Sequence, residues 1–210
     1  MTHGPTDDRA VPAPARVVLL GLMGAGKTTV ARAVAQALGW PRLDNDEQVT
    51  AATGATAREV ARHDGLDRLH EVEADVLRDV LDRPPPVVAT AAASVIDDPA
   101  LAGWLADRAT TVWLRARPET LAGRVLRDPD RPILAGAGRD AVTSELEAQL
   151  ARRGPRLEQL ADLVVDVDDR SPAQIADLVV AALAGRSPAA PVVAPAGSDP
   201  VPGSPGARPG

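Results

Sequence analysis

Residues 21–28 read Gly21-Leu22-Met23-Gly24-Ala25-Gly26-Lys27-Thr28 and fit the pattern G-x-x-x-x-G-K-[ST] of phosphate-binding loops. An apolar run at residues 16–20 precedes this stretch and a helical run at residues 29–38 follows it, as the pattern requires. Glycines allow the backbone to turn its N–H groups toward phosphate oxygens, and the N-terminus of the following helix adds partial positive charge. The stretch therefore predicts a phosphate-binding loop between a strand and a helix.

The composition singles out Lys27, because it is the only lysine among 23 lysine and arginine residues. A planar guanidinium does not replace a compact ammonium on a flexible stem, so a lysine kept at this position favours a functional role. We expect Lys27 to reach the β- and γ-phosphates of a nucleotide and the Thr28 hydroxyl to bind Mg²⁺. The nucleotide is expected to contact Gly24, Ala25, Gly26, Lys27, Thr28 and Thr29.

Length and composition narrow the class of protein. The chain has 210 residues, 45% of them hydrophobic, with no Phe, Tyr or Cys, which excludes a disulfide scaffold and a cysteine zinc site. It has no apolar run long enough to cross a membrane and no signal-peptide pattern. A net charge of −6 argues against general nucleic-acid binding. We expect a cytoplasmic monomer that acts on a small molecule, with no nucleic-acid or membrane partner.

Short apolar segments alternate with helical segments, which is typical of a parallel α/β sheet. After Arg16, the first segment is apolar from Val17 to Leu20, as in a sheet that is buried on both faces. We therefore predict a three-layer α/β/α sandwich around a five-stranded parallel sheet, a P-loop NTPase fold. The expected strands are residues 16–20, 40–44, 87–90, 110–114 and 163–167.

The domain organisation follows from where this pattern begins and ends. Residues 1–15 and 185–210 are rich in Pro, Gly and Ala and have no periodic apolar pattern, so we expect a disordered leader and a disordered tail around a domain at residues 16–184. The last long helix, residues 141–160, is expected to be disturbed at Gly154-Pro155.

Three motifs follow the first three expected strands. They are the phosphate-binding loop, the pair of carboxylates in Asp44-Asn45-Asp46, and the triplet Ala91-Ala92-Ala93. Ligands of such sheets bind beyond the carboxyl ends of the strands. The three motifs are therefore expected to meet at one site.

These motifs, with Arg131-Pro132 in a later loop, resemble the shikimate kinase family, of the nucleoside-monophosphate-kinase branch of P-loop folds. The likeness covers residues 16–184. It implies phosphorylation of a hydroxyl by ATP and Mg²⁺, with shikimate as acceptor and 3-phosphoshikimate as product, in the biosynthesis of chorismate and aromatic amino acids.

The resemblance also implies roles for single residues. Lys27, Asp46 and Arg131 match catalytic positions, Thr28 and Asp44 match the Mg²⁺ contacts, and the loop at about residues 127–139 matches a lid. The other matches are Arg124, Arg131 and Arg170 on the ATP side, and Asp46, His70, Ala92, Ala93 and Arg153 on the acceptor side.

Two positions depart from the family pattern. Ala91-Ala92-Ala93 stands where the family has three glycines, and His70 stands where it has a second arginine for the acceptor carboxylate. The triplet is read either as a reshaped turn at the acceptor or as the start of a helix. Two alternatives to a shikimate kinase stay open: a kinase for another small hydroxylated acceptor, and a nucleotide-binding regulatory module without transfer activity.

Overall fold

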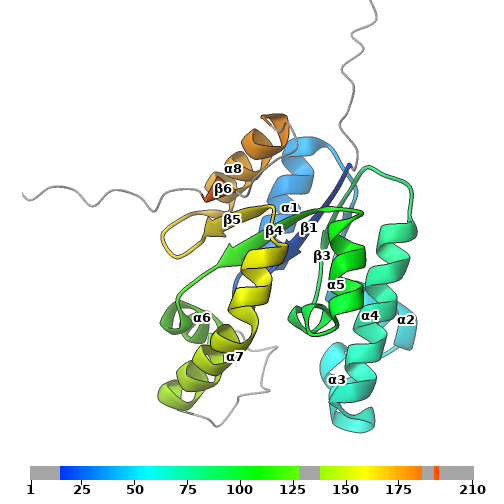
Figure 1. Cartoon of the computed structure of the whole chain (residues 1–210). Coiled ribbons are helices and arrows are strands. Elements are labelled where there is room, and N and C mark those ends of the chain that lie inside the picture. The colour runs from blue at the N-terminus through cyan, green and yellow to red at the C-terminus, as the bar shows by residue number, and fades with distance from the viewer. Residues whose placement is uncertain (1–14, 128–137, 186–191, 194–210) are drawn as a thin grey trace, which may run out of the picture.

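The computed structural model describes residues 15–127, 138–185 and 192–193. Its centre is a parallel sheet in which the strands lie in the order β2-β3-β1-β4-β5-β6 (Figure 1). Strand β1 pairs with β3 on one side and with β4 on the other, and both pairs are parallel. The strands are β1 (Arg16–Leu20), β2 (Arg42–Leu43), β3 (Val87–Thr90), β4 (Thr110–Arg115), β5 (Leu163–Asp166) and β6 (Val192–Val193).

Helices cover both faces of the sheet (Figure 1). Helices α1 and α8 pack together on one face, and α4, α5 and the end of α7 pack on the other. The described helices are α1 (Lys27–Leu38), α2 (Asn45–Thr53), α3 (Ala57–Asp64), α4 (Leu66–Asp82), α5 (Pro99–Ala106), α6 (Pro118–Val125), α7 (Arg139–Leu160), α8 (Pro172–Ala184) and the 3₁₀ turn η1 (Ala93–Ile96).

The core is built mainly from aliphatic side chains, with Trp113 as a buried aromatic residue, because the chain has no Phe or Tyr. Alternate residues of β1 point to the two faces, so Val17 and Leu19 lie in one cluster and Val18 and Leu20 in the other. A third cluster joins α2, α3 and α4 beside the sheet. The unbroken apolar run of β1 thus places the loop after it between two packed layers.

The three-layer fold with its parallel sheet confirms the prediction from the sequence. The sheet has one strand more than the five predicted, because Val192–Val193 pairs with β5 at the edge. This pair lies in the segment 185–210, for which we expect no structure. The expected leader and most of that tail lie outside the described residues.

The prediction of a disturbed helix at Gly154-Pro155 is wrong, because α7 runs unbroken from Arg139 to Leu160 with Pro155 inside it. A proline disfavours helical geometry in the preceding residue, in part through a clash with the Cβ of that residue. Gly154 has no Cβ, which removes this clash. Burial of Leu146 and Leu157 against the two sides of the core keeps both halves of the helix in place.

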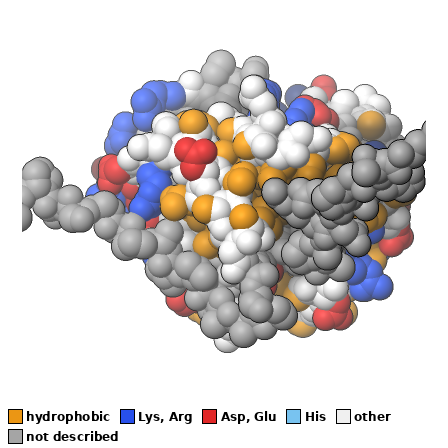
Figure 2. Space-filling view, turned by 90° about the horizontal axis from the view of Figure 1, so that it is seen from above, with side chains coloured by type: hydrophobic (Ala, Val, Ile, Leu, Met, Phe, Trp, Pro, Cys, Tyr) orange, Lys and Arg blue, Asp and Glu red, His pale blue; other side chains and the backbone are white. Residues whose placement is uncertain are grey.

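The face at which the strands begin is shown in Figure 2, which looks down on the molecule from above. Hydrophobic side chains gather near the middle of this face, and charged side chains of both signs lie mostly toward the rim. The candidate site lies at the opposite end of the sheet. Among the described residues, no helix is long and apolar enough to cross a membrane.

Candidate active site

The phosphate-binding loop connects β1 to α1 through three glycines with positive φ. Gly21, Gly24 and Gly26 have φ values of 149°, 82° and 89°. Gly24 also lies against α6, since a Cβ there would stand 2.8 Å from the Leu121 carbonyl oxygen and 3.0 Å from Cγ2 of Val125. The predicted loop is therefore in place, with the N-terminus of α1 directly behind it.

Replacing Gly24 by alanine is expected to destabilise the protein by about 2 to 3 kcal/mol, because the methyl group would have to displace backbone and the left-handed conformation penalises a side chain. Thermal or urea unfolding measures this loss. Gly54→Ala is the matched control, because Gly54 has φ 73° and no heavy atom lies within 4 Å of its added Cβ. Equal losses in the two variants would contradict close packing of the loop on α6.

The ammonium group of Lys27 folds back over its own loop. Its Nζ donates to the Gly21 carbonyl at 2.8 Å and to the Leu22 carbonyl at 3.3 Å. These carbonyls hold the ammonium at the mouth of the loop, where an incoming phosphate would meet it. The Thr28 side chain is half-buried in the first turn of α1, and Thr29 is exposed next to it.

The two predicted carboxylates begin α2. Asp44 is the N-cap and its Oδ1 accepts from the Asp46 amide at 3.2 Å, while its Oδ2 accepts from the Thr90 hydroxyl at 3.2 Å. The same hydroxyl accepts from the Asn45 amide at 2.8 Å. Thr90, at the end of β3, therefore fixes the start of α2. Asp44 is buried and Asp46 is exposed at the carboxyl edge of the sheet.

The alanine triplet forms the entrance to a helical turn. Ala91 is buried, Ala92 is the N-cap of η1 with φ −65° and ψ 150°, and Ala93 is its first residue. This backbone is open to any L-residue, so alanine carries no penalty from positive φ here. Of the two readings of the triplet, the structure shows the helix start, placed at the carboxyl end of β3.

One buried carboxyl at this edge was not predicted from the sequence. Glu73 of α4 accepts a hydrogen bond from the Ser94 hydroxyl of η1. Burial raises the pKa of Glu73, and the hydrogen bond from Ser94 opposes this rise. His70, Asp46 and Lys27 also influence this pKa through their charges, so Glu73 lies among the predicted site residues. The sequence contained one signal for Glu73, because it is an acidic residue between Val72 and Val76 on the apolar face of α4.

Arg153, the predicted carboxylate-binding arginine, is buried on α7 and forms an ion pair with Asp97. Its Nη2 donates to Oδ2 of Asp97 at 2.6 Å, and its Nε lies 3.1 Å from the same oxygen and 3.2 Å from Oδ1. Hydrogen bonding from Arg153 lowers the pKa of Asp97. Asp97 directly follows η1, so this pair lies at the same edge of the sheet as Glu73 and Asp46.

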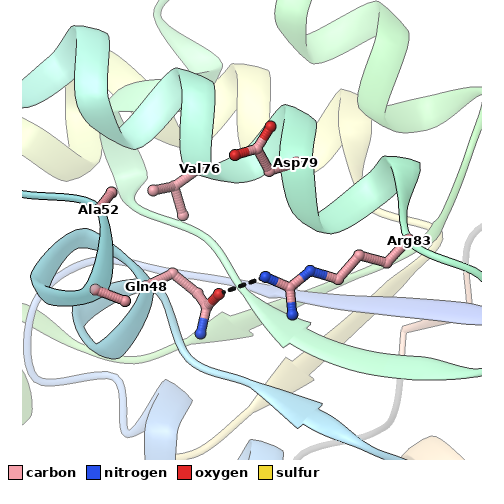
Figure 3. Close-up of a pocket in the computed structure, with 6 residues that line it drawn as sticks. Gln48, Ala52, Val76, Asp79 and Arg83 are labelled. Carbon is pink, nitrogen blue, oxygen red and sulfur yellow. Dashed lines mark hydrogen bonds between the residues drawn. The ribbon is translucent and has the colours of Figure 1, made fainter.

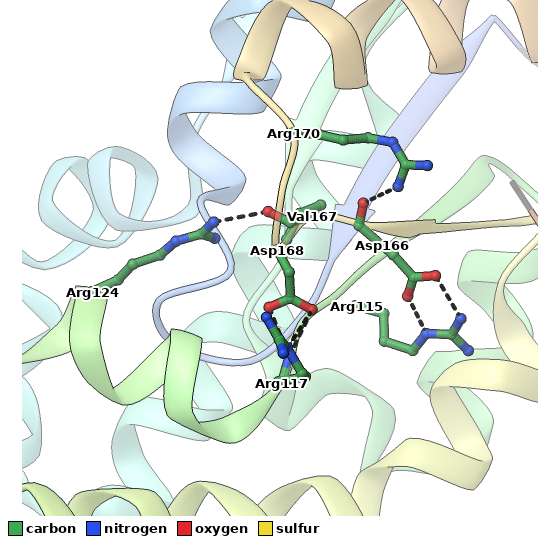
Figure 4. A network of polar contacts seen from close by, with 7 residues as sticks. All are labelled: Arg115, Arg117, Arg124, Asp166, Val167, Asp168 and Arg170. Carbon is green, nitrogen blue, oxygen red and sulfur yellow. Dashed lines mark hydrogen bonds and ion pairs between the residues drawn. The ribbon is translucent and has the colours of Figure 1, made fainter. Parts of the chain in front are cut away.

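Two predicted nucleotide-side arginines, Arg124 and Arg170, lie at the end of β5 (Figure 4). Arg124 of α6 donates to the Val167 carbonyl at 2.8 Å and to the Gly24 carbonyl at 3.4 Å. Arg170 donates to the Asp166 carbonyl at 2.5 Å. These bonds tie both guanidinium groups to the end of β5, next to the loop.

An ion pair between Arg115 of β4 and Asp166 of β5 lies near these two arginines (Figure 4). Arg115 donates from Nε and Nη2 to the carboxylate of Asp166, at 2.5 and 2.9 Å, and lowers the pKa of Asp166. The Arg117 amide donates to Asp168 at 3.2 Å. The ends of β4 and β5 are therefore joined by charged side chains as well as by the ladder.

One predicted catalytic residue lies outside the described residues. Arg131 falls in the gap at residues 128–137, as does most of the predicted lid at 127–139. The gap connects α6 to α7, which carry Arg124 and Arg153. The roles of Arg131 and of the lid therefore stay predictions.

A separate hollow lies between α2 and α4 (Figure 3). It is lined by Gln48, Ala51, Ala52, Val76, Asp79 and Arg83. The Gln48 side chain accepts from Nη2 of Arg83 at 3.0 Å across it. It contains none of the predicted site residues, so we do not assign it to the site.

The described chain contains no group of three or more His, Cys, Asp or Glu arranged around a metal position. A cation at this edge would need oxygens from outside the protein, such as phosphate oxygens.

A P-loop at the carboxyl edge of a parallel sheet, with carboxylates and arginines around it, is the arrangement of a P-loop kinase that acts on a small molecule. Comparison with known proteins gives the family. The family described as shikimate kinase matches residues 23–184. The chain is 35% identical over 161 residues to the shikimate kinase of Cupriavidus pinatubonensis, covering 77% of this chain and 82% of that protein. For the shikimate kinase of Moorella thermoacetica, the identity is 34% over 170 residues, covering 81% and 95%.

Solved structures agree with the sequence relatives. The shikimate kinase of Acinetobacter baumannii in complex with shikimate superposes with a TM-score of 0.71 at 28% identity, covering 79% of this chain and 90% of that one. The enzyme of Bacteroides thetaiotaomicron gives a TM-score of 0.75 at 26% identity, covering 80% and 98%. The chain belongs to the shikimate kinase family.

Proposed function

We propose that this protein transfers the γ-phosphoryl group of ATP to a hydroxyl of shikimate. The observation that carries the proposal is the family match over residues 23–184, in a fold that places Lys27 after β1 and Asp46 after β2, at the same edge of the sheet. Phosphoryl transfer needs alignment and neutralisation of charge more than covalent chemistry. A lysine at the phosphates and a carboxylate at the acceptor supply both.

The mechanism assigns a distinct role to each side of the loop. The loop amides and Lys27 hold the β- and γ-phosphates and stabilise the charge that develops on the transferred group. Asp46 accepts a hydrogen bond from the acceptor hydroxyl, orients its oxygen toward the phosphorus and takes its proton as the new P–O bond forms and the bond to ADP breaks.

Mg²⁺ fits this edge, because the Thr28 hydroxyl and the Asp44 carboxylate are the oxygen ligands that the ion prefers. When bound with ATP, the ion would neutralise charge on the phosphate oxygens. Asp44 is held for this role by Thr90 and by an ion pair with Nη1 of Arg42 at 3.6 Å.

The remaining predicted residues surround the two substrates. Arg124 and Arg170 would contact ATP, and Arg131 would close over the phosphates to exclude water, which otherwise competes as acceptor. Arg153 would bind the carboxylate of shikimate. His70, Ala92 and Ala93 would complete the acceptor side. The protein is expected to act as a monomer in the cytoplasm.

The test is the steady-state rate of ADP formation with Mg-ATP, measured with and without shikimate. A rate that depends on shikimate supports the proposal. ATP binding without stimulation by shikimate would contradict it and would leave two alternatives. Stimulation by another small hydroxylated acid or polyol would identify a different acceptor, whereas no stimulation by any acceptor would indicate a regulatory nucleotide-binding module.

His70 offers a specific test of the acceptor. His70→Arg is expected to lower the KM for shikimate about tenfold, because a charged guanidinium gains about 1.5 kcal/mol or more over a neutral imidazole at a carboxylate. Glu73, the buried carboxyl close by, would help to hold the new cation. Initial rates at saturating ATP measure the change.

His63→Arg is the matched control, because His63 is an exposed residue of α3 that lies outside the site. It is expected to leave the KM for shikimate unchanged. If neither variant showed any response to shikimate, the acceptor would be a different molecule.

A further inference from the structure

The ion pair between Arg153 and Asp97 uses only one edge of the guanidinium. Asp97 accepts from Nε and Nη2, which lie along the side of the group. A guanidinium carries five N–H donors in a fixed planar arrangement, so the end formed by Nη1 and Nη2 stays available to a second carboxylate. A single arginine can therefore be held by one carboxylate while it binds another.

The free end of Arg153 is accessible. Within the described part of the chain, Nη1 of Arg153 has no hydrogen-bond partner, and it is not among the buried polar atoms that lack one. The Arg153 side chain as a whole is only 11% exposed, against 38% for Asp97. The buried stem and the bound edge leave the end of the guanidinium as the accessible part.

Asp97 is itself fixed by the turn that precedes it. Its amide donates to the Ser94 carbonyl at 2.9 Å, and the neighbouring Ile96 is buried in the core. Ser94 also contacts Glu73 of α4 through its hydroxyl. The short η1 turn therefore places Asp97 against α7 and Ser94 against α4.

A second arginine lies near Asp97 without replacing Arg153. Nη1 of Arg156 donates to the Asp97 carbonyl oxygen at 3.3 Å and lies 4.0 Å from its carboxylate. Arg156 is exposed, whereas Arg153 is buried and holds the carboxylate through two nitrogens. The short, two-point contact identifies Arg153 as the partner of Asp97.

We propose that Asp97 is a positioning residue for acceptor binding: it fixes the plane of the Arg153 guanidinium so that its free end binds the carboxylate of the acceptor. This inference rests on the proposed function, in which the acceptor carries a carboxylate. The predicted lid and the nucleotide side have no part in it.

The first test replaces the charge while keeping the shape of the side chain. Asp97→Asn is expected to raise the KM for shikimate about tenfold, with kcat changed less than twofold, which corresponds to about 1.4 kcal/mol of binding. The side-chain amide of Asn has one acceptor oxygen, whereas the Arg153 guanidinium donates to both oxygens of the Asp97 carboxylate. A lower KM would show that Asp97 competes with the acceptor for Arg153, and an unchanged KM would show that it has no effect; either result overturns the inference.

Two controls separate positioning from a general structural effect. Asp75→Asn removes an exposed carboxylate that forms an ion pair with Arg78 on α4, and it is expected to leave the KM unchanged. Asp97→Glu restores the carboxylate and is expected to recover part of the loss. With the methyl ester of shikimate, wild type and Asp97→Asn should have the same KM, because the ester has no carboxylate. An equal loss for the ester would overturn the inference.

A measurement without acceptor separates this inference from the proposed function. In protein labelled with ¹⁵N-arginine, the Nε–H signal of Arg153 should be protected from exchange in wild type and unprotected in Asp97→Asn. The signal is assigned by its absence in Arg153→Lys. Retained protection in Asp97→Asn overturns the positioning role even if shikimate proves to be the substrate. Lost protection supports that role even if wild type fails to use shikimate.

Discussion

Lys27→Ala is expected to lower kcat/KM for shikimate-dependent ADP formation by about a thousandfold, the scale for removing one strong donor to a developing charge. No other lysine exists in the chain to substitute for it. Its Nζ lies at the loop mouth on the carbonyls of Gly21 and Leu22, so its loss removes charge from the phosphate position and leaves the surrounding core intact. A coupled assay at saturating shikimate measures the loss.

Lys27→Arg is the informative companion variant, because it keeps the charge and changes its shape. We expect it to lose most of the activity as well, since a planar guanidinium does not fit a site made for a compact ammonium. Thermal unfolding of both variants should match wild type within a few degrees. Full activity in Lys27→Ala would contradict the assignment of the loop as the phosphate site.

Asp46→Asn is expected to lower kcat by about a hundredfold or more, because the amide cannot take the proton of the acceptor hydroxyl and orients it less well. The KM for ATP should stay close to that of wild type, since Asp46 is proposed to contact the acceptor. The ratio of kcat values at saturating ATP and shikimate is the measurement.

The control for Asp46→Asn is Asp79→Asn on α4. This exposed carboxylate lines the hollow between α2 and α4, away from the site, and its loss is expected to leave kcat unchanged. Asp46 also lies in the first turn of α2, where an acidic residue contributes about 0.3 to 1 kcal/mol, so unfolding curves are needed beside the rates. An unchanged kcat in Asp46→Asn would contradict the proposed role of Asp46 at the acceptor hydroxyl.

Most of the fold was predictable because its signals are local. A buried apolar strand such as residues 16–20, a glycine-rich loop and capped helices each leave a pattern within a short window. The edge strand Val192–Val193 has no such pattern, since its pairing with β5 depends on where the chain returns after α8. The continuity of α7 also escaped prediction, because Pro155 is accommodated by the missing Cβ of Gly154 and by packing at both ends.

The site was predictable to a different degree. Lys27 and Thr28 lie in a motif with a defined spacing, the expected roles of Asp44 and Asp46 came from the family resemblance, and the structure brings all four to one edge of the sheet. Glu73 and Asp97 have no motif of their own. Glu73 meets Ser94, and Asp97 meets Arg153, only because η1 folds between α4 and α7. Contacts between residues so distant in sequence require the three-dimensional arrangement.

Lys27 carries the only primary amine among the side chains, and it lies in the phosphate-binding loop. Apart from an N-terminal amine, Nζ of Lys27 is the group that a reagent for primary amines would modify, since arginine side chains do not react as amines. Acylation there would remove the charge at the loop mouth. Chemical labelling of Lys27 is therefore labelling of the proposed nucleotide position, and the extent of its modification reports how often that position is open.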